Sequence, residues 1–92
     1  MTTAQQIAAA VDNLATAIRN AEHHAMKATE AYALRDLGGF KDQVELNGGY
    51  REDIASANRR LVDLGIPVNC DEDLTVNLSF DLMLNELEEV AA

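Results

Sequence analysis

The 92 residues carry a formal net charge of −9 with only seven Lys and Arg, which disfavours direct binding to DNA or RNA because phosphate contacts depend on basic side chains. A chain of this length predicts one domain, residues 1–92, with too few residues to line a deep substrate cleft once its core is built. No run of 18 apolar residues and no secretory signal pattern are present, so neither membrane insertion nor membrane binding is expected and a cytoplasmic location is favoured.

The negative charge is concentrated in the last third of the chain. Residues 1–60 contain eight acids and seven bases, whereas residues 61–92 contain eight acids and no Lys or Arg. Segregation of this kind indicates a surface of one sign that meets a positively charged partner, often a protein that handles nucleic acid.

Residues 3–37 are predicted to form one long helix. Eleven of the first 37 residues are Ala, the best helix former. Thr3 and Gln6 match a capping box at its start, and Gly38-Gly39 is expected to end it in the left-handed conformation. Apolar residues recur at steps of three and four, the heptad spacing of a helix packed along another helix, at Ala4, Ile7, Val11, Leu14, Ile18, Ala21, Ala25, Ala28 and Tyr32.

The length of this helix restricts the shape of the molecule. Thirty-five helical residues span about 52 Å. A compact globule of this chain length has a diameter of roughly 32 Å. The helix therefore has to bend, break or form the spine of an elongated molecule, and a homodimer through this helix is left open.

Residues 40–49 are ambiguous between a helical turn and a short strand, with Asn47-Gly48-Gly49 as a turn or helix entry. Residues 50–64 predict a second helix, because Tyr50, Ile54, Ala57, Leu61 and Leu64 form one stripe. Gly65 and then Pro67 are expected to end it.

A third helix is predicted from about residue 79, with Ser79 as its cap and Asp81 in its first turn. Residues 73–78 alternate as a strand does and also fit the start of this helix. The predicted fold is all-α: one long N-terminal helix packed by two shorter helices in an elongated bundle, with a minor strand near 40–46 or 73–78 left open.

The acidic C-terminal third is the candidate partner-binding surface. Carboxylates can engage the Arg and Lys side chains that otherwise hold phosphates. If residues 76–90 are helical, Leu78 and Leu82 lie away from the core face of the third helix, which contains Phe80, Leu84 and Leu87. Apolar residues within an acidic surface then suit a protein contact. A strand at 74–82, or burial of both leucines by residues 40–49, is left open. The candidate partner-binding residues are Asp71, Glu72, Asp73, Leu78, Asp81, Leu82, Glu86, Glu88 and Glu89.

No motif indicates catalysis, a cofactor or a metal. Adjacent His23 and His24 project about 100° apart on a helix and cannot chelate one ion together, so a surface or interface role is favoured. Three acids follow Cys70 and disfavour the thiolate that a nucleophile requires. Neither Gly-Gly pair has the spacing of a phosphate-binding loop. We therefore expect a protein that is not an enzyme, with no cofactor and no metal site.

The Ala-rich helix AQQIAAAVDNLATAI, the acidic ending LNELEEVAA and the small size resemble the small acidic proteins that bacteriophages use against host defence, including anti-CRISPR proteins. The resemblance implies a non-enzymatic inhibitor in the host cytoplasm that binds a positively charged ribonucleoprotein effector complex through its acidic C-terminal surface. The alternative, from the residues themselves, is a structural or assembly protein that self-associates through the heptad stripe of the first helix.

Overall fold

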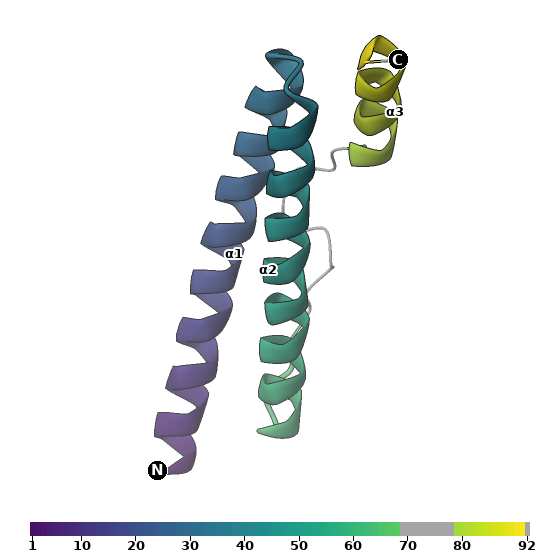
Figure 1. Ribbon diagram of the computed structural model, residues 1–92. Helices are drawn as coiled ribbons and strands as arrows, with labels where there is room; N and C mark the ends of the chain where they lie inside the picture. The colour runs from purple at the N-terminus through teal and green to yellow at the C-terminus, as the bar shows by residue number, and fades with distance from the viewer. Residues whose placement is uncertain (69–78, 92) are drawn as a thin grey trace.

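The computed structural model describes residues 1–68 and 79–91, which form three helices (Figure 1). They are α1 (Thr3–Ala33), α2 (Leu37–Asp63) and α3 (Phe80–Ala91). Within these two ranges there is no strand, so the all-α prediction is confirmed; the strand alternative at 73–78 lies outside the described residues. The molecule measures 55 × 18 × 15 Å, as the length of its first helix requires.

Helices α1 and α2 form an antiparallel hairpin in which alanines make the contact face of α1 (Figure 1). The small side chains allow the two backbones to approach closely. The predicted stripe is correct at Ala21, Ala25 and Ala28 and wrong at Val11, which is 49% exposed. The buried residues of α1 are Ala10, Ala17, Ala21, Ala25, Ala28 and Ala31.

The turn between α1 and α2 corrects the predicted end of the first helix, which lies at Ala33 instead of residue 37. Arg35 adopts the left-handed conformation with φ 57°. The amides of Arg35 and Asp36 donate to the carbonyls of Tyr32 and Ala31, at 3.0 and 2.9 Å, which is the Schellman arrangement. A non-glycine residue therefore supplies the stop that we had assigned to Gly38-Gly39.

Asp36 also begins α2, because its side chain accepts a hydrogen bond from the Gly39 amide at 3.0 Å. The second helix therefore starts at Leu37, and its predicted start at residue 50 is wrong. Residues 40–46 are helical, which rules out the strand alternative there, and Asn47-Gly48-Gly49 continues the helix instead of turning.

Tertiary contacts explain why α2 runs through two glycines that each cost about 1 kcal/mol relative to Ala. Phe40 is 1% exposed and packs against Ala28 and Ala31 of α1. Asn47 is 3% exposed, and its Nδ2 donates to the Ala21 carbonyl at 2.7 Å. Both sides of the glycine pair are thereby held against α1, since Ile54 is also buried there.

Two further helix ends can be compared with the capping residues predicted for them. Gly65 ends α2 with φ 85°, as predicted. The capping box of α1 lies one residue earlier than predicted: the Gln5 amide donates to the Thr2 hydroxyl, and the Thr2 amide donates to the Gln5 side chain.

Helix α3 packs beside the α1–α2 turn, at the end of the hairpin opposite the N-terminus (Figure 1). Leu87 is 2% exposed and shares a core cluster with Phe40 and two alanines of α1. The rings of Phe40 and Phe80 meet edge to face, with centroids 6.0 Å apart. Leu84 packs against the same cluster, so Phe80, Leu84 and Leu87 form the core face of α3, and the opposite side of this helix lies at the molecular surface.

Candidate partner-binding surface

Five of the nine predicted partner-binding residues belong to α3, and all five are exposed: Asp81, Leu82, Glu86, Glu88 and Glu89. The other four, Asp71, Glu72, Asp73 and Leu78, lie outside the described residues. Leu82 is 67% exposed and lines one shallow groove with Glu86 and Glu89, so it has the position expected from the helical pattern. Val90, which the sequence analysis did not select, is 70% exposed.

Glu86 is held by an aromatic residue of α1. The Tyr32 hydroxyl donates a hydrogen bond to the Glu86 carboxylate. The Tyr32 ring also makes a cation–π interaction, with the Arg35 guanidinium carbon 4.9 Å from the ring centroid. One carboxylate of α3 is therefore oriented by the hairpin that carries the helix.

Glu88 has a basic neighbour on α2. Its carboxylate lies 3.7 Å from the Lys41 ammonium group, and both side chains are about half exposed. An ion pair this exposed contributes little stability. It nevertheless neutralises part of the acidic surface, so Asp81 and Glu89 are the acids of α3 without a polar partner among the described residues.

The groove between α3 and the end of α1 combines apolar and acidic groups. Leu82 and Met83 supply apolar surface next to Glu86 and Glu89, and Tyr32 closes one side. A long basic side chain has the matching character, because its methylene stem is apolar and its head is charged.

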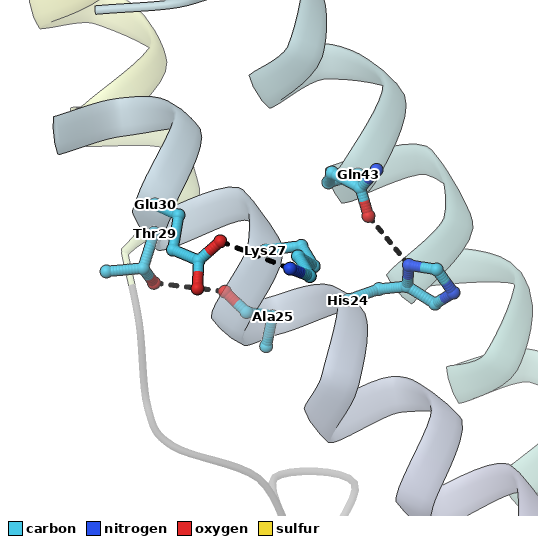
Figure 2. Close-up of polar contacts among 6 residues, drawn as sticks. All are labelled: His24, Ala25, Lys27, Thr29, Glu30 and Gln43. Atoms are coloured by element: carbon cyan, nitrogen blue, oxygen red, sulfur yellow. Dashed lines mark hydrogen bonds and ion pairs between the residues drawn. The ribbon is translucent and has the colours of Figure 1, made fainter. Parts of the chain in front are cut away.

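His24 lies at the interface between α1 and α2. Its Nδ1 lies 2.7 Å from the side-chain oxygen Oε1 of Gln43 in α2 (Figure 2). The His24 ring also stacks on Tyr50, with centroids 5.4 Å apart. These contacts tie α1 to the middle of α2.

Residues 1–68 and 79–91 contain neither a metal-binding cluster nor a membrane-spanning helix. No group of three or more His, Cys, Asp or Glu side chains there is arranged to hold a metal ion. Of the three helices described, none is both long and apolar enough to cross a membrane.

A second groove of about 550 Å³ runs between α1 and α2 toward the N-terminal end of the hairpin. Alanines form its floor, and its rim consists of short polar side chains such as Asn13, Asn20 and Ser56. Among the described residues no histidine or cysteine lines it, and its acidic lining residues are Asp12 and Asp53.

Tyr32 and Lys41 are the residues of this surface that sequence reasoning missed. The heptad stripe correctly predicts that the Tyr32 ring packs against another helix. It does not predict that the Tyr32 hydroxyl binds Glu86. Lys41 fell in a segment whose conformation was ambiguous. Neither contact has a local signal, because each joins α3 to a distant part of the chain.

Searches against protein-family models, curated proteins and solved structures find no match to this chain. The function therefore has to be inferred from the surface of α3 and the charges that it presents.

Proposed function

We propose that this chain is a small non-enzymatic inhibitor or interaction protein that binds a positively charged nucleic-acid-processing complex in the cytoplasm, as anti-CRISPR proteins do. The observation that supports this proposal is the outer face of α3. Four carboxylates and no Lys or Arg occur in this helix, and Leu82 and Val90 are exposed beside them.

Two physical effects favour binding by this face: electrostatic attraction of the partner and contact by exposed apolar side chains. A surface of one sign accelerates encounter with a partner of the opposite sign. Exposed apolar side chains then supply contact area that excludes water around the charged pairs. Glu86 enters this contact already oriented by Tyr32, so less conformational freedom is lost on binding.

The test is affinity capture from bacterial lysate at low and high salt, with three forms of the protein. Asp81→Lys/Glu89→Lys reverses the two α3 acids that have no polar partner among the described residues. Glu45→Lys/Glu52→Lys makes the same change in charge on exposed positions of α2.

The parent and the α2 variant are expected to recover a basic nucleic-acid-processing complex that high salt releases, and the α3 variant is expected to lose it. Circular dichroism should be the same for all three. Equal recovery by the α3 variant contradicts the proposal, as does recovery of no such complex by the parent. Protection of a phage from CRISPR immunity in cells that express each form provides a second readout.

A further inference from the structure

Helix α1 carries a second apolar stripe beside its contact with α2, and Ile18, at one end of this stripe, also packs against the hairpin core. Val11 follows the buried Ala10, and Ile18 follows the buried Ala17, so this stripe is turned by about 100° from the contact with α2. Its residues follow the heptad steps 4, 3, 4, 3. We call it the outer seam; it consists of Ala4, Ala8, Val11, Ala15 and Ile18.

The exposure of the outer seam shows that it is largely free. Ala4, Ala8 and Val11 are exposed, whereas Ala15 and Ile18 are half-buried. Three of its five residues are Ala, which permits a close approach by another helix. The seam lies toward the N-terminal end of the hairpin, away from α3 (Figure 1).

Charge favours a second copy of this chain as the occupant. Residues 1–21 contain one acid, Asp12, and one base, Arg19, so the whole net charge of −9 falls in residues 22–92. Two molecules that each carry −9 repel one another over most of their surfaces. The N-terminal half of α1 is the helical segment where they can meet without placing unbalanced like charges together.

The two charged residues also fix an orientation. Asp12 and Arg19 are both exposed and occupy the heptad e positions that flank the outer seam, whereas the other flank faces α2. In an antiparallel pair, e positions face e positions. A crossing at Ala15 places Ala15 opposite Ala15 of the second copy. It brings Val11 within one residue of Ile18, and Asp12 within one residue of Arg19, of the second copy.

We propose that this protein forms an antiparallel homodimer through the outer seam of α1, with an Asp12–Arg19 pair on its rim. The seam is about 21 Å long, so the interface is small and the affinity weak. The protein is therefore expected to dimerise only at high concentration. This surface is separate from the outer face of α3, and the proposal does not rest on the proposed function.

The test is sedimentation equilibrium of the full chain from about 10 µM to about 1 mM, the range in which a weak interface populates both states. The apparent mass should rise above the 10.0 kDa of the monomer toward twice that value. Val11→Glu should keep the monomer mass throughout. Leu46→Glu, at a position of α2 with similar exposure (45% against 49%), should behave as the parent does.

A charge swap tests the orientation without touching the apolar residues. Asp12→Arg should weaken dimerisation at least several-fold, and adding Arg19→Asp should restore it, while circular dichroism stays unchanged. A parent that remains at the monomer mass at every concentration overturns the proposal. So does a Val11→Glu protein that dimerises normally, or a double charge swap that fails to restore the dimer.

Discussion

The side-chain amide of Asn47 in α2 donates a 2.7 Å hydrogen bond to the main-chain carbonyl of Ala21 in α1, and both residues are buried. This is a polar contact in an interface made mostly of alanine and aliphatic side chains. Alanines pack in more than one register at similar cost. A buried polar pair can select one register, because any shift leaves the amide without its acceptor.

Asn47→Asp should lower the free energy of unfolding by about 2 kcal/mol or more, because a buried carboxylate then faces the Ala21 carbonyl oxygen with no proton to donate. Urea denaturation followed by circular dichroism measures this change. Asn13→Asp, an exposed position on α1, is the matched control and should change stability by less than about 0.5 kcal/mol. Equal effects of the two substitutions would show that the buried hydrogen bond is not the cause.

The adjacent glycines Gly38 and Gly39 should respond differently to Ala. A Cβ at Gly38 meets the Asp36 side chain at 3.9 Å, an ordinary contact, so Gly38→Ala should stabilise α2 by up to about 1 kcal/mol. A Cβ at Gly39 would lie 2.9 Å from Asp36 Cγ and closer still to one carboxylate oxygen. Gly39→Ala should therefore displace the cap and leave the protein about 1 kcal/mol less stable than Gly38→Ala.

Thermal unfolding of the two variants, repeated in the Asp36→Ala background, checks this explanation. Without the capping carboxylate the difference between Gly38→Ala and Gly39→Ala should largely disappear. A difference that persists in the Asp36→Ala background would have a cause other than the cap.

The glycine pair inside α2 should be replaceable without steric cost. Among the described residues, and apart from the chain neighbours and the backbone of α2 itself, no atom lies within 4 Å of a Cβ built at Gly48 or Gly49. Gly48→Ala and Gly49→Ala should each add up to about 1 kcal/mol of stability, raising Tm by roughly 4–8 °C per substitution. Gly65→Ala is the contrasting variant and should lower Tm, since φ 85° strains any residue with a Cβ. A fall in Tm for Gly48→Ala or Gly49→Ala would mean that the native state requires the absence of a side chain at that position.

The fold class was predictable because apolar residues at steps of three and four and a high alanine content indicate helices, however those helices pack. The length of α2 was not, since Gly48-Gly49 reads as a turn by local propensity alone. What keeps the helix continuous is the packing of Phe40 and Asn47 against α1, which involves residues far away in the sequence.

The residues of α1 that contact α2 were only partly predictable, because the contact depends on how closely the two helices approach. Choosing the largest apolar side chains selected Val11, but the hairpin uses Ala10 and Ala17, because small residues allow the helices to approach. On the candidate surface, the helical spacing placed Leu82 correctly beside Glu86. The contacts of Glu86 with Tyr32 and of Glu88 with Lys41 depend on where α3 docks, and no spacing within α3 encodes them.

Leu87 is the residue on which the docking of α3 depends most. It is 2% exposed and is the one side chain of α3 that is fully buried among those the structure describes. Leu87→Ala should cost about 2–5 kcal/mol. A 12-residue helix is marginal in water without tertiary contacts, so the expected result is loss of helix in α3 while the α1–α2 hairpin persists.

Hydrogen exchange measured by mass spectrometry separates these two regions. Amides of residues 80–91 should lose protection in Leu87→Ala, and those in the middle of α1 should keep theirs. Val90→Ala, at a position of the same helix that is 70% exposed, should leave both regions unchanged. If Leu87→Ala instead lowers protection equally throughout, then α3 and the hairpin unfold as one unit. A substitution that detaches α3 would then also unfold the hairpin. Only substitutions at exposed positions such as Asp81 and Glu89 would therefore test the role of the outer face of α3 in binding.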